Sequence, residues 1–291
     1  MIAVRLMGGL GNQLFQYAFG KAMEIVTGKE IYFYHIGNVE KERPLFIVKI
    51  TPSIKMLSEK DISKYYLFPG GGCLARIERR LIGRIPLVGG NIHLESSLSY
   101  YSVDKDKVCY DGYWQSFRYF DEFKSIIEED LKFKESVSIP ASLESEISQI
   151  NSVSLHIRRG DYLNPNRRSI HFSLGLEYYY KALHTITARL KDPVIYVFSD
   201  DLGWARDNLR IPDRAAAKFM EHNTEYQDIA DIYLMSSCKH NIIANSSFSW
   251  WGAYLNSNSE KLVIAPFKWY IGKLGFKIDD LIPQTWIKVR W

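Results

Sequence analysis

The sequence predicts an α/β protein whose strands form mostly parallel, doubly wound sheets. Apolar runs of strand length alternate with amphipathic stretches at helical spacing along most of the chain, a pattern typical of this class. Glycine-rich or polar turns follow several runs, at the sheet edge where such folds bind ligands. The 291 residues are enough for two medium domains. We expect domains at 1–150 and 151–291, joined through the polar stretch 134–150.

The first domain is expected to open with a strand, a tight turn and a long helix. Ile2–Leu6 is an apolar run, and the glycine-rich residues 7–13 follow it. From Asn12 to Thr27 the apolar residues form one stripe at helical spacing, and Gly28 is a natural helix stop. Further elements are expected as a strand at 30–34 and a helix at 121–133.

The second domain repeats the alternation of strand and helix. Its first strand begins near Asn151 and ends at a pair of arginines. Helices are expected at 176–190 and 225–237, with another after residue 245, and strands at 193–198, 240–244 and 261–266.

Composition excludes several classes of protein. The net charge is +4 and no Lys/Arg block is present, so nucleic acid is not expected as a partner. Cys73, Cys109 and Cys238 form no metal-binding or disulfide pattern, which favours a reducing compartment. The chain shows no signal peptide and no run of about 18 apolar residues, so we expect a cytosolic protein without a membrane span.

The segment from Asn151 to Tyr162 contains His-Ile-Arg-Arg-Gly-Asp at the end of an apolar run. Strand alternation points His156 and Arg158 one way and Arg159 the other. A guanidinium at the carboxyl edge of a sheet is suited to gripping phosphate. The alternative is that one of the arginines only forms an ion pair with Asp161.

Gly8, Gly9 and Gly11 lie between a strand and a helix, where backbone N–H groups and the helix dipole favour an anion. The turn lacks the third glycine of a dinucleotide fingerprint, and no acid ends the next strand. Both facts argue against a nicotinamide or flavin site. The alternative is a tight turn with Asn12 as the helix N-cap.

Two further turns carry polar side chains after predicted strands. Ser246 and Ser247 precede a helix and can bind phosphate, or Ser246 can simply cap the helix. Asp200 and Asp201 can accept from the N1–H and N2 amine of guanine, although one of them is expected to cap the following helix. The neighbouring Trp250 and Trp251 are expected in the core.

Two single residues are candidates because of where they lie. Asp231 shares a helix face with Asp228 amid apolar neighbours, so we consider it a partner in the site. His171 follows the loop after the arginines and precedes a helix, which makes it a candidate base or acceptor contact.

Four motifs occur in order along the chain, and together they resemble glycosyltransferase family 11, the α-1,2-fucosyltransferases, many of them bacterial. They are Gly8-Gly-Leu-Gly-Asn-Gln-Leu-Phe-Gln16, His156-Ile-Arg-Arg-Gly-Asp-Tyr162, Phe198-Ser-Asp-Asp201 and Asn245-Ser-Ser-Phe-Ser-Trp-Trp-Gly252. The resemblance implies a GT-B-like fold, with two Rossmann-type domains and the active site in the cleft between them. It also implies GDP-L-fucose as donor and a galactose-terminated acceptor.

The same resemblance implies a role for each motif residue. Arg158 would contact the pyrophosphate, helped by Arg159, and His156 with one of Asp200 and Asp201 would read guanine. Asn12 would reach toward the reacting centre. Donor contacts are also expected from the glycine turn and the serine turn: Gly9, Gly11, Ser246, Ser247 and Phe248.

The expected reaction is attack of the galactose 2-hydroxyl on fucose with inversion, while Arg158 stabilises the charge that develops on the leaving GDP. No metal-binding D-x-D triplet is evident in the four motifs, so we expect no metal and no cofactor. For the base, Asp161 and His171 stay open as candidates, as does proton transfer to the substrate's own phosphate.

Two other functions are considered, an NAD-dependent sugar-nucleotide epimerase and a non-catalytic carbohydrate-binding protein. The incomplete glycine fingerprint argues against the first, and the combined arginine, aspartate and serine motifs argue against the second. Bacterial family members assemble O-antigen, which implies a lipid-linked acceptor and peripheral attachment at the inner face of the plasma membrane. The sequence determines neither the acceptor glycan nor the oligomeric state.

Overall fold

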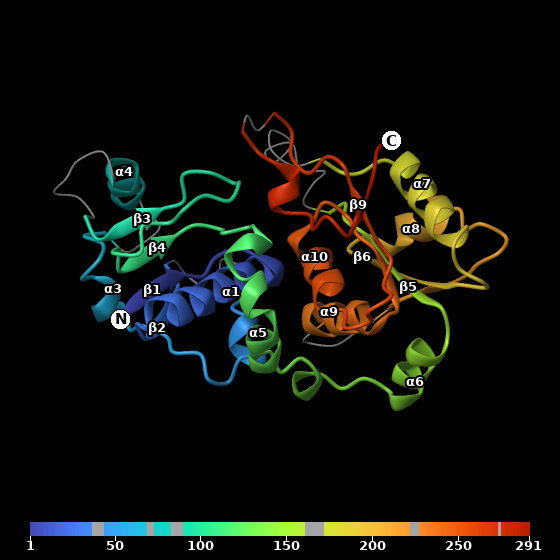
Figure 1. Cartoon of the computed structure of the whole chain (residues 1–291), viewed down its shortest axis with the longest axis horizontal. Coiled ribbons are helices and arrows are strands. Elements are labelled where there is room, and N and C mark those ends of the chain that lie inside the picture. The colour runs from blue at the N-terminus through green and yellow to red at the C-terminus, as the bar shows by residue number, and fades with distance from the viewer. Residues whose placement is uncertain (37–43, 69–72, 83–89, 161–171, 222–226, 273–274) are drawn as a thin grey trace. The chain divides into compact units, whose positions relative to one another are not determined.

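The computed structural model divides into two compact units, Met1–Lys132 and Phe133–Trp291, whose elements are labelled in Figure 1. It describes all residues except 37–43, 69–72, 83–89, 161–171, 222–226 and 273–274. Each unit contains one sheet in which every strand pair is parallel. The predicted α/β class with two parallel-sheet units is therefore confirmed.

The first unit has a four-stranded sheet in the order β2-β1-β4-β3. Its strands are β1 (Ile2–Arg5), β2 (Ile31–Tyr34), β3 (Ile92–Leu94) and β4 (Cys109–Asp111). Its helices are α1 (Leu10–Thr27), α2 (Ile47–Ile50), α3 (Glu59–Ile62), α4 (Cys73–Leu81) and α5 (Lys124–Asp130), with the 3-10 turns η1 (Phe117–Tyr119) and η2 (Asp121–Phe123).

Helix α1 shows how the sequence pattern becomes structure. Its predicted apolar stripe is buried as far as Met23, whereas Val26 in the last turn is exposed. Gly28 ends the helix in the left-handed conformation, with φ 65°. The helix begins two residues earlier than predicted, because extended Gly9 is its N-cap. The helix predicted at 121–133 is shorter, since the Lys132 N–H leaves the helical pattern and donates to the Ile50 carbonyl at 2.7 Å.

The second unit has a six-stranded sheet in the order β10-β9-β8-β5-β6-β7. Its strands are β5 (Ser152–Ile157), β6 (Val194–Ser199), β7 (Ala216–Phe219), β8 (His240–Ile242), β9 (Val263–Pro266) and β10 (Ile287–Val289). Its helices are α6 (Ala141–Gln149), α7 (Leu176–Thr187), α8 (Leu202–Asn208), α9 (Gln227–Ser237) and α10 (Ser247–Tyr254), with the 3-10 turns η3 (Lys134–Ser136) and η5 (Ile278–Asp280).

The core of the second unit is built on β5, of which all six residues are buried. Apolar side chains of β5 and β6 pack with those of α7, as in a strand covered on both faces. Residues 134–150, expected as a joining segment, belong to this unit because Ile147 of α6 is fully buried in it. Helix α7 ends before Leu190 because the chain turns back toward β6 through Asp192, with φ 46°.

Among the described residues, no helix combines the length and the apolar character that crossing a membrane requires.

Candidate active site

The carboxyl ends of β5 and β6 bring two predicted motifs together. The strands are neighbours in the sheet, and Ile157 pairs with Ser199 at their ends. The next residues, Arg158 and Asp200, therefore meet at one edge. From β5 the sheet continues outward through β6 and β7, and from its neighbour β8 it continues the other way through β9 and β10. The strand order therefore reverses between β5 and β8, and doubly wound sheets bind ligands at such a switch point.

The Asp200 carboxylate contacts three donors from the turn that follows β5. Its Oδ2 lies 3.1 Å from Nη1 of Arg158. The backbone N–H of Arg159 donates to Oδ1 at 2.9 Å, and that of Gly160 donates to Oδ2 at 3.1 Å. A Cβ added to Gly160 would lie 2.8 Å from Oδ2, so this close approach requires glycine. Asp200 thus holds the turn and the Arg158 guanidinium together.

Arg159 contacts helix α8. Its Nε lies 3.3 Å from Asp201 Oδ2, and its guanidinium carbon lies 3.6 Å from the centre of the Trp204 ring. The Asp201 Oδ1 accepts from the Trp204 N–H at 3.1 Å, so Asp201 caps α8, and the prediction that one of the two aspartates is a cap is confirmed. Asp161, the alternative partner of the arginines, lies outside the described residues.

His156 is buried in β5 directly beside this edge. Its ring centre lies 5.4 Å from that of Phe248, tilted by 44°. Burial, and then the charge of Arg158, lower the pKa of His156 to about 3, so the imidazole is neutral near pH 7. Its Nδ1 is buried without a hydrogen-bond partner among the described residues. Such an atom is suited to a polar ligand, and the guanine contact stays a prediction.

The serine turn after β8 lies at the same edge. Ser246 is the N-cap of α10, and its Oγ accepts from the Phe248 N–H at 3.3 Å. The buried Asn245 amide donates to the carbonyls of Phe172 and Trp269, at 3.0 and 3.3 Å, which fixes the turn. The helix thus presents its N-terminus at this edge, as an anion site would require. The donor contacts of Ser246, Ser247 and Phe248 stay predictions, whereas the core position of Trp250 and Trp251 is confirmed.

Asp231 lies in α9 and is partly buried. Burial, and then the charge of Asp228, raise the pKa of Asp231 to about 8. A carboxyl group perturbed in this way is typical of functional sites, and its role stays a prediction. His171 lies outside the described residues.

In the first unit, the glycine turn is a tight loop before α1. Gly8 has φ 77°, and an added Cβ there would lie 2.6 Å from Asn12 Nδ2. The alternative in which Asn12 caps α1 is wrong, because Gly9 occupies that position. Instead, Asn12 Oδ1 accepts from Gln115 Nε2 at 2.7 Å. Donor contacts of Gly9 and Gly11, and the reach of Asn12 to the reacting centre, stay predictions.

Two buried glutamines hold this turn, and the sequence reasoning missed them. Gln13 Nε2 donates to the carbonyls of Gly8 and Pro44, at 2.9 Å each. Gln16 Oε1 accepts from the Met7 N–H at 2.9 Å, and its Nε2 donates to the Gly112 carbonyl at 3.2 Å. The available signal was the pair of amides inside an otherwise apolar helix stripe.

A second set of polar groups, at least partly buried, lies at the ends of β3 and β4. Both carboxyl oxygens of Asp111 accept hydrogen bonds from Arg5 Nη1, at 3.2 and 3.0 Å. Glu95 accepts from the N–H groups of Tyr113 and Trp114 at 2.7 and 2.9 Å. Burial raises the pKa of Glu95 to about 7. Glu95 lies in a stretch without clear periodicity, and the sequence singled out neither Glu95 nor Asp111.

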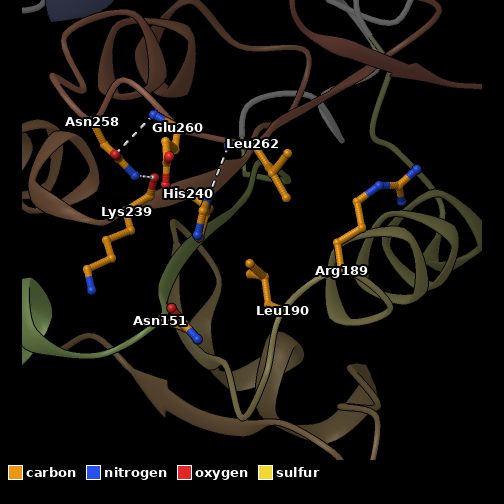
Figure 2. Close-up of a pocket in the computed structure, with 8 residues that line it drawn as sticks. All are labelled: Asn151, Arg189, Leu190, Lys239, His240, Asn258, Glu260 and Leu262. Atoms are coloured by element: carbon orange, nitrogen blue, oxygen red, sulfur yellow. Dashed lines mark hydrogen bonds between the residues drawn. The ribbon is translucent and has the colours of Figure 1, made fainter.

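A hollow of about 530 Å³ lies at the opposite end of the second sheet from Arg158. It is lined by residues that follow α7 or lie just before or at the start of β5, β8 and β9: Asn151, Arg189, Leu190, Lys239, His240, Asn258, Glu260 and Leu262. Figure 2 shows the charged ends of Lys239 and Arg189 pointing apart. The hollow therefore does not bring these two cations together around a ligand. Among the described residues, no three His, Cys, Asp or Glu side chains group as metal ligands.

The family model for "Glycosyl transferase family 11" matches residues 95–290. The chain belongs to glycosyl transferase family 11. Over its whole length it is 30% identical to an Escherichia coli protein named alpha-1,2-colitosyltransferase, of which the match covers 99%. It is also 30% identical to the E. coli O-antigen biosynthesis glycosyltransferase WbnK, over 98% of this chain and 99% of that protein.

More distant relatives of this family 11 chain carry fucosyltransferase names. A mouse galactoside 2-alpha-L-fucosyltransferase, Sec1, is 25% identical over 88% of this chain and 64% of its own length. Among solved structures, the NodZ alpha-1,6-fucosyltransferase soaked with GDP-fucose matches 87% of this chain and 91% of that chain, with 12% identity and a TM-score of 0.48.

Proposed function

We propose that this family 11 protein transfers L-fucose from GDP-β-L-fucose to the 2-hydroxyl of a galactoside, with inversion at the sugar carbon. Family membership supports glycosyl transfer, and two relatives carry names with a 1,2 linkage or a 2-position. The observation that carries the proposal is the Arg158 guanidinium, which Asp200 holds at the carboxyl edge of β5, the same sheet edge at which α10 begins after β8.

The chemistry requires a group that stabilises the leaving nucleotide. The acceptor oxygen forms a bond to the fucose C1 while the bond from C1 to the β-phosphate oxygen breaks, so its electron pair stays with GDP. Arg158 offsets the negative charge that grows on that oxygen, and Ser246 and Ser247 add donors from the start of α10. The hydroxyl proton leaves to a base or to the phosphate itself.

The remaining residues of this edge are proposed to bind the nucleoside. Neutral His156 offers a buried Nδ1 to a polar group, and Phe248 packs against its ring. Arg159 is engaged by Asp201 and Trp204, so we propose that it shapes the edge while Arg158 contacts phosphate. No metal enters this scheme, because a fixed guanidinium supplies the charge that a divalent ion would otherwise provide.

A second donor is favoured by one specific observation, the 30% identical relative named alpha-1,2-colitosyltransferase. Colitose is L-fucose without its 3-hydroxyl, so both donors present the same GDP and the same anomeric carbon. A site with a buried partner for the 3-hydroxyl would reject the deoxy sugar, whereas an apolar site would accept both. We propose GDP-fucose as the preferred donor.

The test is a donor and acceptor panel. Purified protein is incubated with GDP-fucose or GDP-colitose and a set of β-galactosides, and products are analysed for linkage by NMR. The proposal expects a 1,2-linked fucosyl product, also in excess EDTA, and formation of that product about 10²-fold or more slower with Arg158→Ala. A higher kcat/KM with GDP-colitose would move the assignment to the second donor. Loss of activity in EDTA that magnesium restores would contradict the metal-free scheme.

The two other functions are separated by thermal shift. Stabilisation by GDP supports transfer, stabilisation by NAD supports an epimerase, and stabilisation by a glycan alone supports a carbohydrate-binding protein. We further propose that the acceptor is a lipid-linked oligosaccharide of surface-polysaccharide assembly, because the relative WbnK is named for O-antigen biosynthesis. Comparing a free galactoside with the same sugar on a lipid carrier tests this part.

A further inference from the structure

Large apolar side chains are exposed on and beside α4, which Figure 1 labels in the first unit. Leu67 is 75% exposed, Phe68 44%, Leu74 57% and Ile77 47%. Leu74 and Ile77 are three residues apart and so lie on one face of the helix. Large contiguous apolar patches on a protein surface mark interaction sites.

The exposed stripe of Leu74 and Ile77 is not the face by which α4 packs on its own unit. That face is formed by Ala75, Glu78 and, just after the helix, Ile82, all of which are buried. Ile82 packs in a core cluster that also contains Ile62 and Tyr66. Successive side chains of a helix are rotated by about 100° around its axis. Leu74 and Ile77 therefore project to one side of the face that packs on the unit. The helix is therefore packed on its unit while Leu74 and Ile77 stay exposed.

Glu78 joins the two sets of exposed apolar residues. Its two carboxyl oxygens accept from the N–H groups of Leu67 and Phe68, at 2.6 and 2.8 Å. These bonds fasten the 67–68 segment to the helix, so the four apolar side chains belong to one region, here called the α4 patch. Glu78 is 5% exposed, so its charge is withdrawn from the surface.

Helix α4 carries a net positive charge. Its sequence, CLARIERRL, has Glu78 as its one acid and three arginines, Arg76, Arg79 and Arg80. Arg80 is exposed. Exposed apolar side chains on a helix of net positive charge match the chemistry of an anionic bilayer surface. There the apolar groups enter the boundary of the acyl chains and guanidinium groups meet lipid phosphates.

We propose that the α4 patch docks the protein on membranes that contain anionic phospholipid. This inference stands independently of the proposed transfer reaction, because no residue of the α4 patch belongs to the candidate active site. An enzyme held at the bilayer in this way would meet a lipid-linked acceptor by diffusion in two dimensions.

The experiment is vesicle co-sedimentation of the full chain. Vesicles of phosphatidylcholine with phosphatidylglycerol are compared with vesicles of phosphatidylcholine alone, at low and high salt. We expect binding to the anionic vesicles that weakens as salt rises. Leu74→Gln with Ile77→Gln should lower the partition coefficient about tenfold, and Arg80→Gln about fivefold.

A matched control uses the exposed apolar pair Ile25 and Val26 at the end of α1, which are 39% and 46% exposed. Changing both to Gln should leave vesicle binding within twofold. Equal losses in the control and in the α4 variant would overturn the proposal, as would absence of binding to anionic vesicles at low salt. Light scattering that shows a dimer dissociated by the α4 variant would also overturn it, since a second copy would then cover the α4 patch.

Discussion

Arg158 and Asp200 form an ion pair of 3.1 Å at the adjoining ends of β5 and β6, and the same carboxylate receives the N–H groups of Arg159 and Gly160. Asp200 is therefore engaged by the turn that carries Arg158, the residue proposed to contact the donor phosphates. The pairing presents the Arg158 guanidinium at the edge of the sheet.

Replacing Arg158 with Ala should lower kcat by about 10²-fold or more, because one preorganised charge partner of the leaving group is lost. Arg158→Lys should recover only part of this loss, since an ammonium cannot make a forked contact. The measurement is steady-state transfer from GDP-fucose, with GDP affinity from calorimetry. A change in kcat below threefold would make a phosphate role for Arg158 untenable.

Replacing Asp200 with Asn should separate positioning from guanine recognition. If Asp200 holds Arg158, the affinities for GDP and for inosine diphosphate should fall together, by about tenfold, as expected when a hydrogen bond to a charged group is lost. If a carboxylate reads the guanine N2 amine, the preference for GDP over inosine diphosphate should disappear in Asp200→Asn or in Asp201→Asn. Calorimetry with both nucleotides decides between the two outcomes for each aspartate.

Replacing Gly160 with Ala should displace the Asp200 carboxylate, because the added Cβ would lie 2.8 Å from Oδ2. We expect kcat/KM to fall about tenfold with little change in Tm, since the turn lies at the surface. Gly203→Ala is the control: no atom lies within 4 Å of its added Cβ. It should keep full activity and, inside a helix, raise stability by about 0.5–1 kcal/mol. In an Arg158→Ala background, the effect of Gly160→Ala should nearly vanish; a full tenfold loss there would contradict the link to Arg158.

The sequence predicted where this site would form but not which side chains would pair. Apolar runs followed by polar turns located the carboxyl ends of β5, β6 and β8, since strand periodicity is a local property. The choice of Asp200 as partner of Arg158 depends on the register of β5 against β6, in which Ile157 pairs with Ser199. Register is a tertiary property that no single segment encodes.

Related reasons explain why the sequence did not predict the roles of the other polar residues. Gln13 and Gln16 contact backbone groups far along the chain, so their amides looked like isolated polar residues in a core helix. Glu95 lies in a stretch where neither helical nor strand spacing was visible, and it becomes distinctive only through burial. Such long-range acceptors and donors emerge only once the fold is assembled.

Asp231 should make stability fall as pH rises. Its pKa is raised to about 8 in the folded protein, mainly by burial, so the folded state binds a proton that the unfolded state has already released. The contribution of this proton to the free energy of unfolding is fully present below the ordinary pKa of a carboxyl group. It is lost as pH rises through about 8. Asp231→Asn removes the buried charge, so Tm of the variant relative to the wild type should increase between pH 5 and pH 9, by roughly 2–4 °C for each 1 kcal/mol. A difference in Tm that stays constant with pH would contradict the raised pKa.

The Asn12–Gln115 hydrogen bond, 2.7 Å between Oδ1 and Nε2, allows two roles of Asn12 to be distinguished. If Asn12 serves only to fasten the loop after β4, then Asn12→Ala and Gln115→Ala should cost similar stability, about 0.5–1.5 kcal/mol for the shared bond, and similar activity. If Asn12 also contacts the reacting sugars, Asn12→Ala should lower kcat at least about tenfold more than Gln115→Ala, while the double variant is no less stable than the sum of the single variants predicts. Urea denaturation of the four proteins gives the coupling energy, and steady-state transfer gives the rates. Equal losses of kcat in the two single variants would assign Asn12 to the scaffold of the glycine turn.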